Sequence, residues 1–390
     1  MKKLIREKFY LTQYDHISLI IVCCLLLIGL YLQFDIATSL GDSWRMIVFA
    51  KQLVWVLLGA LCFMIIFFQE NLADFIHKYS GLFLGLLLLL LGIVLFWGEE
   101  YQGARRWLNL YFFTLQPSQL ACPILIISYA KNFSINQKYI PTVGFKQFFL
   151  HFYPLIFISV LIFTLIMLSN HLSTVLVIGF SLLSVMFIAG FKKRLILSIL
   201  GSIVLCFCLL IVFGPKFRAG RLTNSMHYNI FCKALGIGTS TIPEEPNQIS
   251  ESITALSKGS ILGIGSSKSR AKHLFLSDIK KDYIFTLWGE QFGFVGGFFI
   301  IGLFTLLFYR ASLISMAKDD LFQKLVIFGF GINIFISSII HIGVSIAILP
   351  TTGLPLPFIS LGGTAMVVNL CMLGVILNFS TLKRKIHVKL

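Results

Sequence analysis

Residues 284–309 read IFTLWGEQFGFVGGFFIIGLFTLLFY and carry a single charged side chain, Glu290. Crossing the hydrocarbon core of a bilayer takes about 20 predominantly apolar residues in a helix. The stretch meets this requirement and predicts a transmembrane α-helix. Asp282 is the last charged residue before it, so we expect its carboxylate at the boundary between membrane and water.

The rest of the chain repeats this pattern. Of 390 residues, 57% are hydrophobic and 12% are charged, whereas a soluble domain has about 25% charged residues. We therefore expect an all-α polytopic membrane protein, a single membrane domain over residues 1–390 with about ten transmembrane helices. Continuous apolar runs, rather than alternating ones, exclude a transmembrane β-barrel. The further spans are predicted at 16–34, 46–68, 81–97, 115–132, 152–169, 172–190, 195–214, 325–349 and 358–379.

The distribution of Lys and Arg predicts the orientation. Cytoplasmic loops of membrane proteins carry an excess of these residues, and with an even number of spans four cationic clusters fall on one side. We therefore expect a multi-pass membrane protein with both termini in the cytoplasm. The formal net charge is +16. No basic segment is long enough to form a soluble domain, so we expect the cationic side chains to contact membrane lipids and not nucleic acid. The clusters are Lys2, Lys3, Arg6 and Lys8; Lys131, Lys138 and Lys146; Lys192, Lys193 and Arg194; and Lys383, Arg384, Lys385 and Lys389.

Residues 215–283 form the one long polar stretch, which we predict to be a large extracytoplasmic loop between the seventh and eighth spans. The loop is basic, with Lys258 among its ten Lys and Arg residues from Lys216 to Lys281. Long loops translocate largely regardless of charge, so the predicted topology stands. The charge indicates either a solvated surface or a site for an anionic ligand at the outer membrane surface.

Two carboxylates lie around the start of the span 284–309. Asp282, beside Lys280 and Lys281, would have its pKa raised by partial desolvation or lowered by the neighbouring cations, and it suits either a general base or a helix cap. Glu290 lies about two helical turns further on, roughly on the same face. An intramembrane carboxylate is a functional candidate by default, and a structural pairing with Arg or Lys is the alternative.

Three other motifs hold polar groups where the predicted spans begin or end. Arg105 and Arg106, within Gly-Ala-Arg-Arg-Trp, offer planar donors that match phosphate, or they anchor the chain at the interface. Ser118 follows Gln-Pro at the start of a span, where a plain helix start explains it equally well. Residues 353–364, GLPLPFISLGGT, cannot form a regular helix, so they form either a connecting loop or a re-entrant turn that shapes a site. In this last motif Ser360, Gly362 and Gly363 are the candidate site residues.

Eight cysteines are present, with no CxxC pair and no spacing typical of metal ligands. Seven of them lie in apolar runs, where a buried small apolar role explains them. We predict no protein-bound metal site and no required cofactor. A divalent cation, Mg or Mn, is the alternative to Arg and Lys for neutralising an anionic ligand.

The order of these motifs resembles the SEDS family of shape, elongation, division and sporulation proteins (FtsW, RodA and SpoVE). It runs from Gly-Ala-Arg-Arg-Trp and Gln-Pro-Ser through acid-x-x-x-Asp-aromatic-Ile-Phe and Gly-Glu-x-x-Gly-Phe-Val-Gly to Gly-x-Pro-Leu-Pro-Phe-Ile-Ser-x-Gly-Gly. The resemblance covers nearly the whole chain. It implies a peptidoglycan glycosyltransferase that polymerises lipid II, a disaccharide-pentapeptide on undecaprenyl pyrophosphate, and that works with a class B penicillin-binding transpeptidase.

The resemblance also assigns roles to residues. The catalytic aspartate of the family falls on Asp282, and its upstream acidic partner falls on Asp278. Substrate contacts are expected from Arg105, Arg106, Asp278, Glu290, Lys258, Ser118, Ser360, Gly362 and Gly363.

The chain departs from the family pattern at several positions. The family's Gln-Pro-Ser-Glu-Leu-x-Lys has Gln119 and Cys122 here, which indicates the loss of an ion pair. His171 and His341 also replace usual residues, so the chain is a divergent member.

Gly103 to Trp107 and the Gly289–Glu290 pair are closer to division members of the family than to elongation members. Septal or lateral wall synthesis is the implied role, with a lipid II flippase or a non-catalytic scaffold for the transpeptidase as alternatives.

Overall fold

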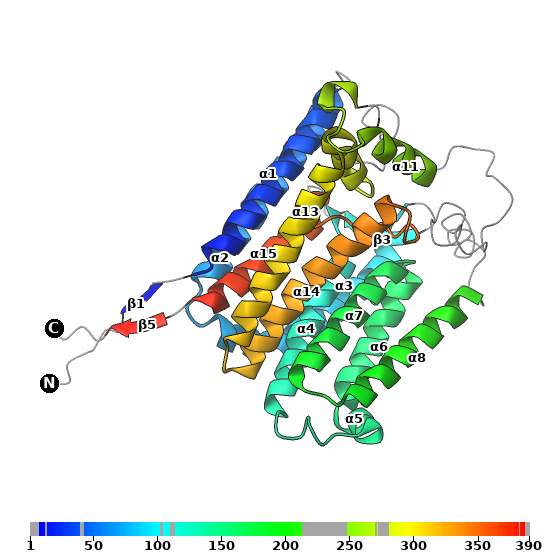
Figure 1. The fold of residues 1–390 in the computed structure, drawn as a ribbon. Helices are drawn as coiled ribbons and strands as arrows, with labels where there is room; N and C mark the ends of the chain where they lie inside the picture. The colour runs from blue at the N-terminus through cyan, green and yellow to red at the C-terminus, as the bar shows by residue number, and fades with distance from the viewer. Residues whose placement is uncertain are drawn as a thin grey trace.

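The computed structural model describes residues 8–11, 14–39, 43–101, 104–109, 114–212, 248–269, 271, 281–381 and 383–386, and within these ranges the chain is a bundle of α-helices (Figure 1). Every predicted apolar segment contains a helix. These helices are α1 (His16–Thr38), α2 (Ser43–Phe68), α3 (Leu72–Trp97), α4 (Ser118–Ile135), α6 (Tyr153–Leu168), α7 (Leu172–Ala189), α8 (Lys193–Val212), α13 (Ile284–Met316), α14 (Leu321–Ser345) and α15 (Gly363–Ser380).

Shorter elements join or flank these helices. The helix α5 (Phe145–His151) precedes α6 and is bent by 83° from it. Between α8 and α13, inside the predicted loop 215–283, lie α11 (Gln248–Gly259) and the 3₁₀ turn η1 (Ser266–Lys268). Residues 213–247 and 272–280, which include Asp278, lie outside the described residues.

The prediction of an all-α polytopic membrane protein is confirmed. Within the described residues, seven helices are long and apolar enough to cross a membrane, or eight if α5 and α6 form one bent span. The predicted number of ten is not established by this test. Polar residues such as Gln119, Lys131 and Asn132 lower the hydropathy of α4, and α6 has only 16 residues.

Some predicted boundaries were wrong. α3 begins at Leu72 rather than 81 because the helix continues through a polar first turn, where Asp74 complements the positive end of the helix dipole. α15 begins at Gly363 rather than 358, because Phe358 has a positive φ of 64° that a helix cannot contain. The predicted tight turn at Asn170–His171 is confirmed, and Asn170 adopts φ 55° there.

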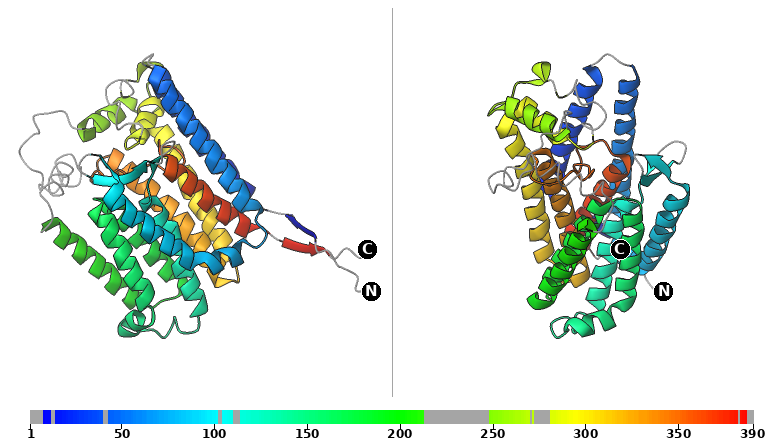
Figure 2. Two further views of the ribbon diagram at one scale, coloured as in Figure 1. Left: turned by 180° about the vertical axis from the view of Figure 1, so that it is seen from behind. Right: turned by 90° about the vertical axis from the view of Figure 1, so that its right-hand side faces the viewer.

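The helix α14 lies at the centre and packs against α4, α7, α13 and α15. α2 covers α15, and α1 packs between α2 and α13, as two further views show (Figure 2). α2 turns large apolar side chains outward, which is what lipid contact requires. Examples are Val54, Leu57, Leu61, Ile65 and Phe68.

Short antiparallel strands lie at the two ends of the bundle. β2 (Glu99–Tyr101), β3 (Ala104–Asn109) and β4 (Thr114–Leu115) form a small sheet in the order β2-β3-β4 between α3 and α4. β1 (Lys8–Leu11) pairs with β5 (Lys383–Ile386), so that Lys8 faces Ile386 and the two terminal segments are joined. We call the end with β2–β4 and Asp282 the Asp282 end, and the other the Asp15 end.

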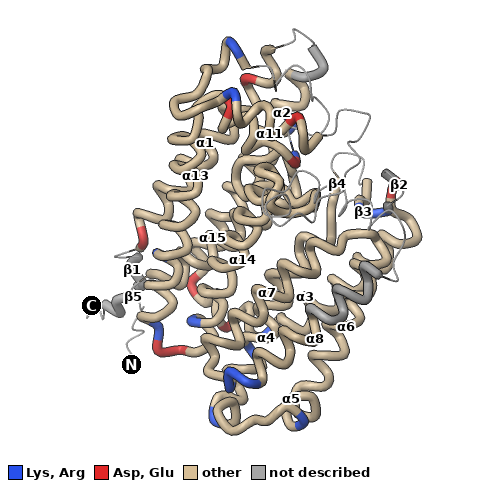
Figure 3. Tube along the Cα trace, turned by 45° about the vertical axis from the view of Figure 1, so that its right-hand side comes forward, with Lys and Arg blue, Asp and Glu red and all other residues tan. Residues whose placement is uncertain are grey.

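A buried ion pair fixes the Asp15 end. Arg310 of α13 donates from its guanidinium to the carboxylate of Asp15, which also accepts a hydrogen bond from Ser18. Burial alone would raise the pKa of Asp15, but the hydrogen bonds from Arg310 and Ser18 and the Arg310 charge outweigh it and lower this pKa. Lys and Arg also gather near α5 at this end (Figure 3).

Close packing explains one of the predicted site glycines. The indole ring of Trp55 in α2 lies against the backbone of Gly363, where a Cβ atom would be 2.1 Å from the ring. The ring has no room to retreat cheaply, since α2 packs along the length of α15. Gly363 is therefore required for packing of the first turn of α15 against α2.

We expect Gly363→Ala to lower the thermal stability of the purified protein, because overpacking of this kind costs about 1–3 kcal/mol. The matched control is Gly85→Ala in the middle of α3, where a Cβ atom would meet nothing within 4 Å. Helix propensity there predicts a neutral or slightly stabilising change. The measurement is the melting temperature in detergent micelles, and an equal effect of the two substitutions would contradict this account of Gly363.

Candidate functional site

The centre of the candidate site is the segment 351–362 between α14 and α15, which we call the Gly-Pro loop. It is not helical, as its prolines and glycines predict. Two of its backbone carbonyls accept hydrogen bonds from side chains of neighbouring helices. The buried His341 of α14 donates from Nδ1 to the carbonyl of Leu354 at 2.8 Å, and Ser173 of α7 donates to the carbonyl of Thr352 at 3.0 Å. The loop is thus part of the folded core and not a free connection.

Ser360 joins this loop to the residues that precede α13. Its hydroxyl accepts a hydrogen bond from the amide of Leu356 and donates one to the carbonyl of Lys281, both at 2.8 Å. Gln52 of α2 donates to the Ser360 carbonyl at 3.4 Å. Ser360 is buried and lies within this network, so its hydroxyl positions Lys281 and Asp282 against the loop.

Asp282 is half-buried beside Gly353 of the Gly-Pro loop, with Oδ2 4.0 Å from the position that a Gly353 Cβ would occupy. Asp282 directly precedes Tyr283, the N-cap residue of α13, so it lies at the start of the helix without being its N-cap residue. The expectation that Asp282 and Glu290 share one helix face is wrong, since α13 begins only at Ile284. A half-buried carboxylate outside the helix suits a group that accepts a proton from a substrate.

The two arginines of β3 have different surroundings. Arg106 donates from Nε to the carbonyl of Ser169 at 3.2 Å and from Nη2 to that of Asn170 at 2.6 Å, so it ties β3 to the α6–α7 turn. Arg105 is exposed, and its Nη2 atom lies 3.7 Å from Oε2 of Glu100. The ammonium of Lys281 lies 5.6 Å from the ring centre of Trp107, within reach of a cation–π contact. Cationic side chains therefore border the segment that carries Asp282.

Ser118 opens α4 and contacts the buried His171 of the α6–α7 turn. The Nδ1 atom of His171 lies 3.3 Å from the Ser118 hydroxyl and 2.7 Å from that of Thr174. Burial, followed by the positive charge of Arg106, lowers the pKa of His171 to about 3. The imidazole is therefore neutral near pH 7 and serves as a hydrogen-bonding link between α4 and α7.

Glu290 lies away from this loop, fully buried in α13. Its Oε2 accepts hydrogen bonds from the hydroxyl of Ser269 at 2.5 Å and from the amide of Ala271 at 3.1 Å. Lys258 is exposed in the last turn of α11. The structure thus brings Asp282, Ser360 and Gly353 together. Arg106 of β3 and Ser118 of α4 both contact the α6–α7 turn. No described hydrogen bond or ion pair joins Lys258 to these residues.

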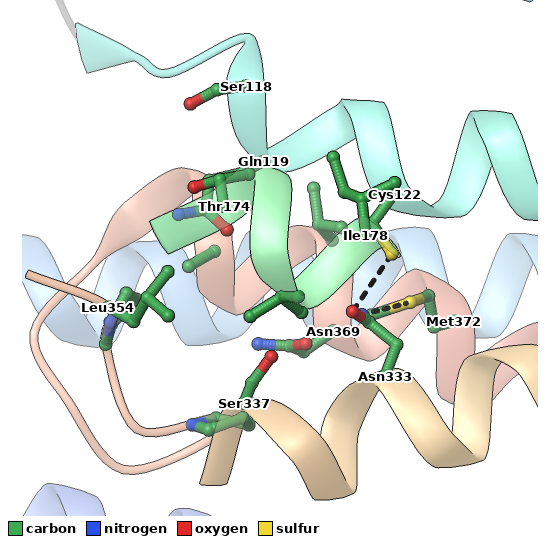
Figure 4. Close-up of a pocket in the computed structure, with 15 residues that line it drawn as sticks. Ser118, Gln119, Cys122, Thr174, Ile178, Asn333, Ser337, Leu354, Asn369 and Met372 are labelled. Atoms are coloured by element: carbon green, nitrogen blue, oxygen red, sulfur yellow. Dashed lines mark hydrogen bonds between the residues drawn. The ribbon is translucent and has the colours of Figure 1, made fainter. Parts of the chain in front are cut away.

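A small cavity of about 30 Å³ lies beneath the Gly-Pro loop, and polar side chains from several helices point into it (Figure 4). Cys122 donates from Sγ to Oδ1 of Asn333 at 3.0 Å, and Asn333 donates to the sulfur of Met372 at 3.6 Å. Gln119 lines the same cavity. Gln119 and Cys122, where the family pattern has Glu and Lys, thus line one cavity that has no charged side chain in its lining. Its other polar lining residues are Ser118, Thr174, Ser337 and Asn369.

No group of three or more His, Cys, Asp or Glu side chains suited to a metal ion occurs among the described residues. The side-chain oxygens of Glu290 and Ser360 form hydrogen bonds within the chain.

Sequence reasoning missed several residues that hold the site. Gln52, Thr364 and Gln116 form hydrogen bonds at the Asp282 end: Thr364 accepts from the amide of Gln116 at 3.1 Å and donates to the carbonyl of Thr114 at 3.2 Å. His341 was noted only as a departure from the family. Gln52 carried a usable signal, since an amide side chain inside an apolar helix indicates a polar partner.

The fold and the site define a polytopic membrane protein in which a helix-breaking loop holds a carboxylate at one end of the bundle. The family model described as "cell cycle protein", for FtsW, RodA and SpoVE, matches residues 15–385. The chain therefore belongs to the FtsW/RodA/SpoVE family.

Individual relatives agree with this membership. The chain is 31% identical over 304 residues to a protein of Geobacter sp. named "probable peptidoglycan glycosyltransferase FtsW", covering 78% of each chain. It is 30% identical over 380 residues to the stage V sporulation protein E of Bacillus subtilis, covering 96% of this chain and 98% of the relative.

Two solved structures share the fold. One chain, from a peptidoglycan synthase complex solved to describe the coordination of polymerization and crosslinking, has a TM-score of 0.74 at 23% identity, covering 94% of this chain and 97% of that one. The rod shape determining protein RodA of Thermus thermophilus has a TM-score of 0.63 at 22% identity, covering 94% and 96%.

The depressed pKa of His171 predicts a pH dependence of stability. In the unfolded chain this pKa is near 6.5, so between about pH 6.5 and pH 3 the unfolded state binds more protons than the folded state. The contribution of His171 is complete above pH 6.5 and is lost as the pH falls toward 3. We expect His171→Asn to flatten this part of the melting-temperature profile in detergent, and an unchanged slope would contradict the assignment.

A second prediction concerns the neutral cavity. Cys122→Lys alone should lower stability by roughly 3–5 kcal/mol, because it buries an unpaired charge. Adding Gln119→Glu, three residues away on the same face of α4, should recover part of this loss. The steric cost of the lysine is common to the single and double variants and cancels in a double-mutant cycle of melting temperatures. Strictly additive losses would contradict the inference that the two positions share one site.

Proposed function

We propose that this protein is a peptidoglycan glycosyltransferase that polymerises lipid II, with Asp282 as the general base. The observation that carries the proposal is the placement of the Asp282 carboxylate against the Gly-Pro loop, through the contact of Ser360 with Lys281 and the proximity of Gly353. The family membership and the names of the relatives support the same activity.

The proposed reaction needs one proton acceptor. The 4-hydroxyl oxygen of the acceptor sugar forms a bond to the anomeric carbon of the donor, and the bond from that carbon to the pyrophosphate oxygen breaks. The hydroxyl proton passes to the Asp282 carboxylate, and the bonding electrons leave with undecaprenyl pyrophosphate. General base catalysis of this kind contributes on the order of 10²–10⁴-fold, and pyrophosphate needs little acid assistance as a leaving group.

The charge of the leaving group needs cations near the headgroups. Lys281 adjoins Asp282 and lies over Trp107, and Arg105 and Arg106 belong to the same strand as Trp107. We propose that these side chains neutralise the pyrophosphate, while the substrate contacts assigned to Lys258 and Asp278 come from the family resemblance alone. Glu290 and Ser360 instead make contacts within the chain, which favours a positioning role for both.

The orientation and partners are also part of the proposal. The cationic residues near α5 favour the cytoplasm for the Asp15 end and for both termini, which puts Asp282 at the outer face of the cytoplasmic membrane. A class B penicillin-binding transpeptidase is the proposed partner, supported by the likeness to a chain of a peptidoglycan synthase complex. The Arg105–Arg106 pair and the Gly289–Glu290 pair favour septal over lateral wall synthesis.

Polymerisation of purified lipid II by the full-length protein, with and without the transpeptidase, tests the proposal. We expect Asp282→Ala and Asp282→Asn to lower the rate of glycan synthesis by about 10²–10⁴-fold without loss of folding. The matched control is Asp319→Asn. Asp319 is an acidic residue in the turn between α13 and α14, at the Asp15 end. This variant should polymerise at the wild-type rate.

Each contrary outcome has a defined meaning. Glycan strands made by Asp282→Ala at the wild-type rate would contradict the general-base role. Movement of lipid II across vesicles by the wild-type protein, without polymer, would favour a flippase. Recruitment of the transpeptidase with neither activity would favour a scaffold.

A further inference from the structure

A groove of about 120 Å³ lies among the helices α4 to α8, and we call it the α5 groove. Its one polar side-chain group is the hydroxyl of Tyr129, which is hydrogen-bonded to the hydroxyl of Ser159 at 3.1 Å. An apolar cavity of roughly 150 Å³ stays dry and accepts a hydrocarbon guest. The α5 groove is therefore suited to hydrocarbon. Its lining includes Phe148, Phe149, Phe163, Leu182 and Met186.

The helix α8 forms the outer wall of the α5 groove through Ile199 and Ile203. It packs mainly against α7 and lies at the edge of the bundle (Figure 1). Phe149 of α5, which also lines the groove, is 41% exposed, so the groove opens at the surface of the bundle. In a membrane this surface faces lipid, and acyl chains have access to the groove.

The helix α5 borders the groove at the Asp15 end. It is bent by 83° from α6, so that where α6 runs across the membrane α5 runs along its surface. Its exposed side chains include the apolar Phe145, Phe149 and Leu150 together with Lys146. This composition is typical of a helix that lies at the boundary between headgroups and acyl chains.

The turn between α7 and α8 lies against α5. The ring centre of Phe191 in this turn is 5.6 Å from that of Phe148 in α5. The ammonium of Lys192 donates to the carbonyl of Thr142, just before α5, at 3.0 Å. These contacts bring the cationic start of α8 to the side of the groove that α5 borders.

Three exposed cations result at this side of the α5 groove: Lys146 in α5, and Lys193 and Arg194 in the first turn of α8. The gathering of Lys and Arg near α5 is visible in Figure 3. Residues 101–243 contain no Asp or Glu, so this part of the chain supplies no carboxylate to neutralise the cations. A basic pocket beside membrane helices attracts anionic lipid headgroups.

We propose that the α5 groove binds an anionic glycerophospholipid, with one acyl chain in the groove and the phosphate among Lys146, Lys193 and Arg194. The two parts of such a lipid match the two parts of the site, hydrocarbon against the apolar lining and negative charge against the cations. The bound chain supports α8 on the side that α7 does not cover. The site lies at the end opposite Asp282, so it does not depend on the proposed reaction.

Native mass spectrometry of the full-length protein in detergent tests the proposal, with dioleoylphosphatidylglycerol as the probe. We expect tighter binding than that of dioleoylphosphatidylcholine, which has the same chains and no net charge. Glycerol 3-phosphate, which has the anionic group but no acyl chain, should not bind. The anionic lipid should also raise the melting temperature, because a ligand of the folded state stabilises it.

The charge arm of the test uses Lys193→Gln. Each Lys or Arg near an anionic headgroup is worth about fivefold in affinity, so this variant should bind phosphatidylglycerol about fivefold more weakly. The matched control is Lys78→Gln. Lys78 is an exposed cation of α3, also near the Asp15 end but away from the groove, and its loss should leave binding unchanged.

The groove arm uses Gly179→Leu. Gly179 of α7 lines the groove, and a Cβ atom there would meet only Ile203, at 3.8 Å, so a leucine has room to enter. By excluding methylene groups of the acyl chain it should weaken phosphatidylglycerol binding by about tenfold or more. The matched control is Gly201→Leu in α8, on the opposite face of the helix from Ile199 and Ile203, where a Cβ atom would meet nothing within 4 Å.

Equal affinity for the two dioleoyl lipids would overturn the proposal, and so would binding of glycerol 3-phosphate as tight as that of phosphatidylglycerol. Unchanged phosphatidylglycerol binding in Gly179→Leu or in Lys193→Gln would also overturn it. If Gly179→Leu does not fold, the exposed Lys193→Gln variant still decides. Tighter binding of undecaprenyl phosphate than of phosphatidylglycerol, lost in the same variants, would assign the groove to a polyprenyl chain and overturn the phospholipid proposal.

Discussion

Backbone amides and carbonyls that leave a helix inside a membrane protein need partners from the protein itself, because hydrocarbon supplies none. This constraint governs both irregular segments of the fold. The Gly-Pro loop receives its partners from His341, Ser173 and its own Ser360, and the break in α13 at Gly293 receives them from residues 260–265. Each solution brings a distant part of the chain to the Asp282 end. The candidate site is thus a consequence of how the backbone of the Gly-Pro loop is satisfied.

The carboxylates near this end lie in different segments of the fold. Asp35 and Glu290 accept hydrogen bonds from Ser266, Gln291, Ser269 and Ala271 of the same chain. Asp282 instead lies outside α13, half-buried beside the Gly-Pro loop.

The departures from the family pattern form a consistent set in the structure. Gln119 and Cys122 face one cavity with Asn333, so uncharged polar groups occupy the place where the resemblance implies an acid and a base. His171 is kept neutral by burial and by Arg106, and His341 donates to the Gly-Pro loop. The interior near the site therefore relies on neutral hydrogen bonds, which avoid the cost of burying charges.

The sequence by itself determined the membrane class, the helix at each apolar segment, the irregular backbone of residues 353–362 and the position of Asp282 at a helix start. These features follow from local composition, since hydropathy and proline act over a few residues. Only the tertiary structure decided that Glu290 binds Ser269 and Ala271, that Gly363 accommodates Trp55, and that Asp282 precedes the first turn of α13. Such contacts depend on residues far apart in the chain, and their partners become known only when the helices are packed together.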